Sequence, residues 1–208
     1  MNTINASSGI IEFTRIYLAI FYTCVAAFYT IKIILAQIKR PVELVLPGER
    51  FCSTWWNHMT FRFFRLSIWM VCLFRVFFEE IDNYLVMFTS LQTLPIIFTG
   101  ITLMTLGFAM TIVVHRSMGD KWRSGIDLEG PKQLITNGFF KYSRNPIFLC
   151  VAVSQIGFFL ALPSVFTLVC LIIGLLMLYR QILSEEKHLT KLFVNEYKIY
   201  TASVRRWL

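Results

Sequence analysis

The sequence predicts an all-α protein, a multi-pass transmembrane helical bundle of about five spans that ends in a C-terminal amphipathic helix. Of its 208 residues, 56% are hydrophobic and only 15% are charged, whereas an ordinary soluble domain has about a quarter charged residues. A soluble core of this size cannot bury so much apolar surface, so we expect the lipid bilayer to act as the solvent. The 20 phenylalanines fit lipid-facing helices and aromatic belts.

The net charge of +8 does not indicate nucleic-acid binding, because the basic residues lie between apolar spans and form no stripe on a soluble module. The five cysteines match no metal or disulfide spacing, and no metal site is expected. The sequence contains no Gly-x-Gly-x-x-Gly segment, no Walker loop and no Gly-x-Ser-x-Gly elbow. It therefore excludes a nucleotide-binding domain of the soluble type.

The first three spans are expected at about residues 13–38, 63–78 and 91–114. Each is long or apolar enough to cross a hydrocarbon core of roughly 30 Å. The second is the least clear, because three arginines interrupt or flank it. Its Arg75 lies four residues before Glu79, so the two side chains can pair near the far face of the membrane.

Residues 146–183 form an almost unbroken apolar run. A single helix of this length would extend about 57 Å, far more than a bilayer requires. Pro163 lies near the middle, so we predict a hairpin of two spans that returns to the same side of the membrane. The tail, 184–208, has apolar residues at helical spacing and predicts an amphipathic helix: Leu189, Leu192, Phe193, Tyr197, Tyr200, Val204 and Trp207.

Basic residues predict the topology. Residues 37–65, 115–145 and 180–208 hold 17 of the 20 Lys and Arg residues, whereas residues 79–92 hold none. The positive-inside rule therefore places the N-terminus outside and the C-terminus in the cytosol. The host membrane would be the plasma membrane in a bacterium or the endoplasmic reticulum in a eukaryote. We expect one integrated membrane domain, with N-terminal transmembrane helices in 1–114 and the site in 115–208.

Polar residues at the two ends of the hairpin are the candidates for chemistry. Asn145 and Pro146 are typical of a helix start, with Asn at the N-cap and Pro at the first helical position. Such a start, with Arg144 beside it, suits a carboxylate or phosphate. Glu185 and Glu186 follow the last span, and their side chains point about 100° apart on a helix, so one can face a pocket while the other pairs. The alternative is structural: Asn145 caps, Arg144 anchors and the glutamates are solvated.

Three stretches in the second half of the chain have a recognisable order and spacing. They are Leu134-Ile-Thr-Asn-Gly-Phe-Phe-Lys-Tyr-Ser-Arg-Asn-Pro-Ile-Phe148, Glu185-Glu-Lys-His-Leu189, and a closing stretch with Phe193, Glu196-Tyr197, Tyr200 and Val204-Arg-Arg-Trp207. Together they resemble the superfamily of isoprenylcysteine carboxyl methyltransferases and phospholipid methyltransferases, which are integral membrane enzymes. The family pattern is Leu-Val-Thr-x-Gly-x-Tyr, then Arg-His-Pro-x-Tyr-x-Gly, then Glu-Glu-x-x-Leu. This chain departs from it at Asn145, Phe148, Cys150 and Phe140, which replace His, Tyr, Gly and Tyr.

The resemblance implies that S-adenosylmethionine is the cofactor and that the partner is a membrane lipid or a lipidated substrate. The acceptor would be a prenylcysteine-like carboxylate, a phospholipid amine or another small lipid. The resemblance implies a catalytic role for Glu186, which would face the ammonium or ribose of the cofactor. Arg206, or alternatively Arg205, would steady an acidic or phosphate-bearing substrate. The residues implied to bind the cofactor are Gln133, Leu134, Gly138, Arg144, Asn145, Pro146, Phe148, Glu185 and Glu186.

Two other functions stay open. Sterol reductases have a related half-domain with a similar Arg-His-Pro segment but use a nicotinamide cofactor. A non-catalytic membrane protein could keep the scaffold, with Asn145, Phe140 and Phe148 as traces of a lost activity. The sequence does not identify the acceptor or the oligomeric state.

Overall fold

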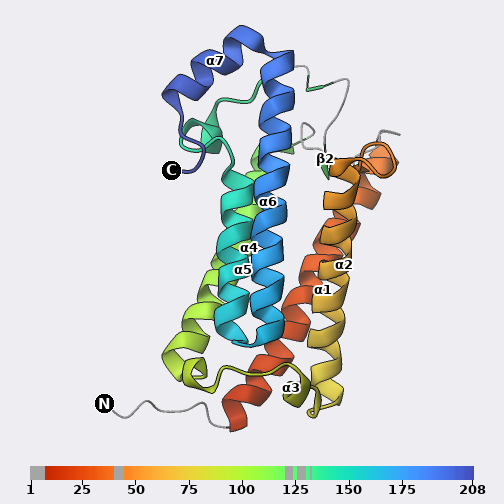
Figure 1. The fold of residues 1–208 in the computed structure, drawn as a ribbon, viewed down its shortest axis with the longest axis vertical. Helices are drawn as coiled ribbons and strands as arrows, with labels where there is room; N and C mark the ends of the chain where they lie inside the picture. The colour runs from red at the N-terminus through yellow and green to blue at the C-terminus, as the bar shows by residue number, and fades with distance from the viewer. Residues whose placement is uncertain (1–7, 40–44, 120–123, 126–129, 132) are drawn as a thin grey trace.

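The computed structural model describes residues 8–39, 45–119, 124–125, 130–131 and 133–208. Five long helices lie side by side along the long axis of the molecule (Figure 1): α1 (Ser8–Lys39), α2 (Ser53–Phe77), α4 (Leu94–Met118), α5 (Pro146–Ala161) and α6 (Val165–Leu192). The shorter elements are β1 (Val45–Leu46), α3 (Ile81–Tyr84), η1 (Thr89–Leu91), β2 (Ser124–Gly125), η3 (Gly138–Lys141) and α7 (Val194–Ser203). This arrangement confirms the predicted helical membrane bundle.

In the described part of the chain, three helices are long and apolar enough to cross a membrane: α1, α4 and α6. Helix α5 is also apolar but has only 16 residues. Helix α2 has 25 residues, but its sequence includes Arg62, Arg65 and Arg75, which lower its mean hydropathy. It begins ten residues before the expected span.

The predicted boundary of the last span at residue 183 was wrong, because α6 continues to Leu192. The stretch from Ser184 to Leu192 contains neither Gly nor Pro, and most of its residues favour helices. The two glutamates therefore lie inside α6, and a separate tail helix, α7, begins only at Val194. In α7, the two buried side chains are Tyr197 and Tyr200.

Helices α4 and α5 pack closely because glycines line their contact. A Cβ atom added to Gly100 would lie 2.3 Å from the backbone nitrogen of Ala161. One added to Gly157 would lie 2.4 Å from the backbone nitrogen of Met104. Small residues let membrane helices approach until their backbones touch, which supplies van der Waals packing where lipid gives no hydrophobic drive. This contact fixes the position of α5, and with it the start of the hairpin.

The hairpin turns at Pro163, as expected. Ser164 caps α6: its hydroxyl accepts a hydrogen bond from the Thr167 backbone N–H, and the Ser164 N–H donates to the Thr167 hydroxyl, both at 3.2 Å. The Pro163 carbonyl accepts a hydrogen bond from the Phe88 N–H at 2.9 Å. The turn is thus anchored to the connection between α3 and α4, and α6 runs back antiparallel to α5 (Figure 1).

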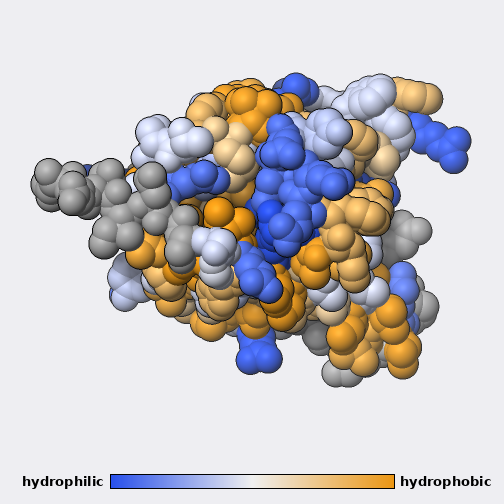
Figure 2. Space-filling view, turned by 90° about the horizontal axis from the view of Figure 1, so that it is seen from below, coloured by the Kyte–Doolittle hydropathy of each residue, from blue (hydrophilic) through white to orange (hydrophobic). Residues whose placement is uncertain are grey.

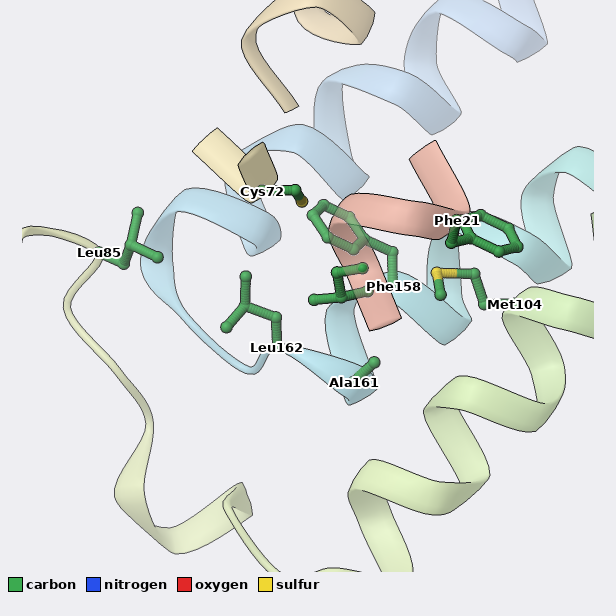
Figure 3. Close-up of a cluster of buried hydrophobic side chains, with 8 residues drawn as sticks. Phe21, Cys72, Leu85, Met104, Phe158, Ala161 and Leu162 are labelled. Carbon is green, nitrogen blue, oxygen red and sulfur yellow. The ribbon is translucent and has the colours of Figure 1, made fainter. Parts of the chain in front are cut away.

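The hydrophobic core of buried side chains joins α1, α2, α4 and α5 near the hairpin turn, and Phe166 of α6 packs against it. Phe158, Ala161 and Leu162 from α5 and its end meet Cys72 of α2 and Met104 of α4 (Figure 3). Each of these side chains is at most 3% exposed. The core therefore packs the turn of the hairpin against the N-terminal helices.

A polar cluster covers the hairpin end, which Figure 2 views from below. Asp82 accepts hydrogen bonds from Arg75 and from Arg15, the latter at 2.8 Å, and Glu79 pairs with Arg15 at 3.0 Å. The suggested pairing of Arg75 with Glu79 was wrong, because Asp82 takes the Arg75 guanidinium. Burial disfavours the Asp82 carboxylate, but the hydrogen bonds and charges of Arg75 and Arg15 outweigh it and hold the pKa of Asp82 below its ordinary value.

The opposite end of the bundle gathers the described parts of the three basic segments. The β1 strand pairs in parallel with β2, with Val45 opposite Ser124 and Leu46 opposite Gly125. Figure 1 shows α7 and the C-terminus at this same end, far from the start of α1 and from α3. The segments rich in Lys and Arg thus lie together, and the acidic connection lies at the other end of the molecule.

Candidate active site

A cavity of about 280 Å³ lies at the basic end of the bundle. Helices α1, α2 and α4 form its walls on one side. The start of α5 and the C-terminal half of α6 form the other side. Its volume is close to the lower end of the range for small-molecule sites, about 300–1,000 Å³. Five of the residues predicted to bind a cofactor line it: Arg144, Asn145, Pro146, Phe148 and Glu185.

The hairpin brings the two polar corners together, as the sequence predicted. The Asn145 Nδ2 amide donates a hydrogen bond to Glu186 Oε1 at 3.2 Å, although 41 residues separate the two. Asn145 is 6% exposed and Glu186 is 9% exposed. The start of α5 and the acidic part of α6 therefore form one buried polar site at one end of the molecule.

Glu186 is the centre of a buried ion cluster. Its carboxylate accepts hydrogen bonds from Arg206 Nη2 at 2.8 Å and from Arg206 Nε at 3.2 Å. Arg144 Nη2 lies 3.5 Å from Glu186 Oε1. The hydrogen bond to Glu186 raises the pKa of Arg206 above its ordinary value. Glu186 is thus occupied by protein partners, and neither Glu186 nor Arg206 lines the cavity.

The chain after α7 lies against the segment that precedes α5. The Arg144 N–H donates to the Arg205 carbonyl at 3.0 Å, and the Ser143 hydroxyl donates to the Arg206 carbonyl at 3.3 Å. The Tyr200 hydroxyl donates to the Phe140 carbonyl at 2.6 Å. Burial raises the pKa of Tyr200 to about 12. These contacts hold the loop before α5 in place.

Asn145 occupies the N-cap position of α5 and Pro146 follows it, as predicted. The Asn145 side chain does not cap the helix, however: it donates to Glu186 and to the Arg206 carbonyl. The N–H groups in the first turn of α5 therefore have no side-chain acceptor. Such a helix start attracts anions through these donors and the helix dipole.

Glu185 is the only carboxylate among the described residues that line the cavity. It accepts one hydrogen bond, from the neutral Gln181 amide at 2.9 Å. As the 100° separation of adjacent residues on a helix implies, one glutamate faces the cavity and the other pairs with arginine. The two roles are exchanged relative to the prediction, which gave the cavity to Glu186. Glu185 faces the cavity and Glu186 pairs with arginine. The catalytic roles of Glu186 and Arg206 stay predictions.

Besides Glu186, three predicted cofactor residues lie outside the cavity lining: Gln133, Leu134 and Gly138. Gln133 and Gly138 are exposed and Leu134 is half-buried. Gly138 begins η3 with φ 60°, a left-handed backbone conformation that favours glycine. The geometry gives Gly138 a turn role, and cofactor binding by these three residues stays a prediction.

The sequence interpretation missed the wall that the N-terminal helices contribute: Tyr29, His58, Arg62, Arg65 and His115 line the cavity from α1, α2 and α4. One signal was available, because positions 58, 62 and 65 share one helical face. Their contact with the second half of the chain depends on helix packing and has no local signal.

Several buried polar atoms at the cavity have no hydrogen-bond partner among the described residues: His58 Nε2, Arg144 Nε and Gln181 Oε1. Buried polar groups usually have partners, so these atoms indicate a site that accepts a polar ligand. The described residues contain no group of three His, Cys, Asp or Glu side chains able to hold a metal ion.

Comparison with protein families shows that the phospholipid methyltransferase family matches residues 95–196. The matched segment contains α4, both arms of the hairpin and the two glutamates. No curated protein and no solved structure matches the chain. The family supports a membrane methyltransferase that acts on lipid. Residues 95–196 thus match the phospholipid methyltransferase family, which is part of the isoprenylcysteine carboxyl methyltransferase-like superfamily.

Proposed function

We propose that the protein is an S-adenosylmethionine-dependent methyltransferase with a lipophilic acceptor, and that the reaction takes place in the cavity at the basic end of the bundle. One observation carries the proposal: the hairpin brings the start of α5 and the acidic part of α6 to the same buried cavity. One site then contains a helix start that can bind the carboxylate of a ligand and a glutamate that can face a cation of that ligand.

The residues at the cavity fit a molecule that carries both a carboxylate and a cationic centre. The uncapped N–H groups of α5 and the unpartnered Arg144 Nε suit the carboxylate. Glu185 suits the cationic centre, because no described cation pairs with it. S-adenosylmethionine, when bound, supplies a sulfonium methyl group, whose transfer breaks the bond to sulfur, leaves the electron pair on a thioether and forms the bond to the acceptor atom.

The protein contributes alignment and a dry environment to such a transfer. Phe148, Val151 and Leu178 give the cavity apolar lining between its polar groups. Charge disperses as a methyl group leaves a sulfonium, so exclusion of water favours the transfer. Alignment of the methyl donor with the acceptor atom supplies most of the rest of the rate enhancement.

Glu186 and Arg206 act as positioning residues in this proposal. They bind each other and Asn145, and so hold the tail against the start of α5. Neither residue belongs to the cavity lining, which favours this role over contact with the reacting atoms.

The acceptor is proposed to enter from the lipid. Arg62 and Arg65 line the cavity and are also exposed, so the cavity is open at this wall. We further propose that the basic end faces the cytosol, because the described parts of the segments that hold 17 of the 20 Lys and Arg residues lie there.

Isothermal titration of S-adenosylhomocysteine into detergent-purified protein tests the proposal. We expect saturable binding that weakens by about tenfold or more in Glu185→Gln and Arg144→Gln, because each exchange removes a charged contact worth about 1.5–3 kcal/mol. Glu196→Gln is the matched control, since Glu196 is exposed on α7, and its affinity should equal that of the parent. Absence of binding, or binding of NADPH instead, would refute the proposed cofactor.

A further inference from the structure

Helix α2 places a histidine in the wall of the cavity. His58 lies one helical turn before Arg62, and both side chains line the cavity. Helix α2 ends at Phe77 and so lies outside residues 95–196, the segment that matches the phospholipid methyltransferase family. The family match therefore assigns no role to His58.

The imidazole of His58 is packed in place but makes no hydrogen bond through Nε2. This nitrogen is buried and has no partner among the described residues. The β1–β2 pair lies directly against the ring, because a Cβ atom at Gly125 would be only 3.0 Å from His58 Nε2. Buried polar groups usually have partners, so an unpartnered nitrogen in the wall of a cavity indicates a group that acts on a ligand.

The surroundings of His58 keep its imidazole neutral. His58 lies in the first two turns of α2, before the expected span at residues 63–78. Burial, together with the positive charges of Arg62 and Arg65, lowers the pKa of His58 below its ordinary value of 6.5. A neutral imidazole accepts a proton on the nitrogen that carries no hydrogen. In the tautomer with hydrogen on Nδ1, that nitrogen is Nε2.

The other ionisable groups of the cavity wall have partners or other roles. His115 lines the cavity, but its Nδ1 lies 2.7 Å from Lys32 Nζ. Glu185 suits the cationic centre of the methyl donor, and the lining arginines are always protonated. Tyr29 carries a phenol, which keeps its proton at neutral pH. Among the described lining residues, His58 is therefore the group best able to take a proton.

His58 lies on the acceptor side of the proposed reaction. In a displacement at carbon, the nucleophile and the leaving atom stand on opposite sides of the carbon, and their alignment is essential to the rate. The start of α5 and Glu185, which suit the methyl donor, form one side of the cavity, and α2 contributes to the other side. A nucleophile that faces the donor across the cavity is then next to the α2 wall.

We propose that His58 is the general base of the reaction and that its Nε2 takes the proton of an acceptor whose nucleophilic atom is protonated in water, such as an ammonium group or a thiol. The inference rests on the proposed function and adds a catalytic residue to it. The bond between the acceptor atom and hydrogen breaks, the proton binds His58 Nε2, and the electron pair stays on the acceptor atom. This pair then forms the bond to the methyl carbon in place of the methyl–sulfur bond. The imidazolium afterwards releases its proton to water, which the charges of Arg62 and Arg65 favour.

The test compares two matched acceptors in nanodiscs with purified protein and labelled methyl donor at neutral pH. One is a diacyl lipid with a primary alkylamine, which is protonated. The other carries fluorine beside the carbon that bears the amine, so its amine is neutral and needs no base. His58→Gln keeps a hydrogen-bond acceptor but cannot take a proton. We expect it to lower kcat for the protonated amine on the order of 100-fold or more, with KM within about twofold of the parent.

The neutral amine should keep its kcat within about twofold in His58→Gln. His188→Gln is the matched control, because His188 lies in α6 outside the cavity lining, and it should change kcat for neither amine. An equal loss of kcat for both amines would overturn the inference, because a structural role affects them alike. Unchanged kcat for the protonated amine would overturn it too. Free imidazole should restore part of the turnover of His58→Ala, which it could not do if the exchange only damaged the fold.

A readout without turnover separates this inference from the proposed function. In ¹⁵N NMR of histidine-labelled protein without methyl donor, the protonated amine should shift the Nε2 resonance of His58. The quaternary ammonium of the same lipid, which has no N–H, should not. No shift, or equal shifts, would overturn the inference. A shift specific to the amine without S-adenosylhomocysteine binding would remove the proposed cofactor and leave the base, whereas S-adenosylhomocysteine binding without the shift would remove the base alone.

Discussion

Exchange of Glu186 for Gln is expected to destabilise the fold much more than the same exchange at the neighbouring Glu185. The Glu186 carboxylate accepts hydrogen bonds from Arg206 at 2.8 and 3.2 Å and from Asn145 at 3.2 Å, and Arg144 lies 3.5 Å away. Glu185 accepts one hydrogen bond, from a neutral amide. The two exchanges are chemically identical and adjacent in sequence, so the difference between them measures the environment alone.

The magnitude follows from the partners that each exchange leaves behind. Removing one partner of a buried ion pair costs about 3–5 kcal/mol. The Arg206 side chain is 32% exposed, so water can partly solvate it after the exchange, and the cost is reduced. We therefore expect Glu186→Gln to lower the free energy of unfolding by about 2–3 kcal/mol. Glu185→Gln keeps an acceptor for its single bond and should cost at most about 0.5 kcal/mol.

Unfolding in mixed micelles by increasing the fraction of sodium dodecyl sulfate, followed by far-UV circular dichroism, measures both values. Arg206→Gln and the double variant with Glu186→Gln complete a double-mutant cycle, in which we expect a coupling energy of at least about 1 kcal/mol. A loss of stability in Glu185→Gln equal to that in Glu186→Gln would refute the assignment of the two glutamates. So would a coupling energy of zero between Glu186 and Arg206.

Three further outcomes are expected. Gly157→Ala should lower the free energy of unfolding by about 1–3 kcal/mol in the same assay, because its Cβ would lie 2.4 Å from the Met104 backbone nitrogen. Gly9→Ala is the control and should not destabilise the fold, because a Cβ at Gly9 would meet nothing within 4 Å. Equal effects of the two exchanges would exclude close packing of α4 against α5. The fold lowers the pKa of Asp82. The ionised Asp82 therefore stabilises the fold fully above its unfolded pKa of about 3.9, and this stabilisation is lost as the pH falls through the folded pKa. Asp82→Asn should show no such loss of stability in acid titrations. Burial raises the pKa of Tyr200 to about 12. The neutral Tyr200 therefore stabilises the fold fully below its unfolded pKa of about 10, and this stabilisation is lost as the pH rises through about 12. Tyr200→Phe, which lacks the hydroxyl that donates to the Phe140 carbonyl, should be less stable at neutral pH and should not lose this stabilisation in alkali.

Much of the fold could be predicted because its signals are local or bulk properties. Hydropathy predicts helices that cross a membrane, and Pro163 predicts the break that becomes the hairpin turn. Charge counts predict which segments share an end, and Asn145 with Pro146 predicts the start of α5. The end of α6 was misplaced, because a polar stretch without Gly or Pro extends a helix beyond the membrane as readily as it starts a new one.

The candidate site could be predicted only in part. The sequence alone determined that a helix start and an acidic pair stand at the two ends of one apolar hairpin. Only the tertiary structure decided that Glu185 lines the cavity while Glu186 pairs with Arg206, and that α2 supplies the opposite wall. The physical reason is that a helix rotates by 100° per residue, so the direction of each side chain depends on the rotation of the whole helix within the bundle. Close packing sets that rotation, as at Gly100 and Gly157, and packing joins residues that are distant in sequence.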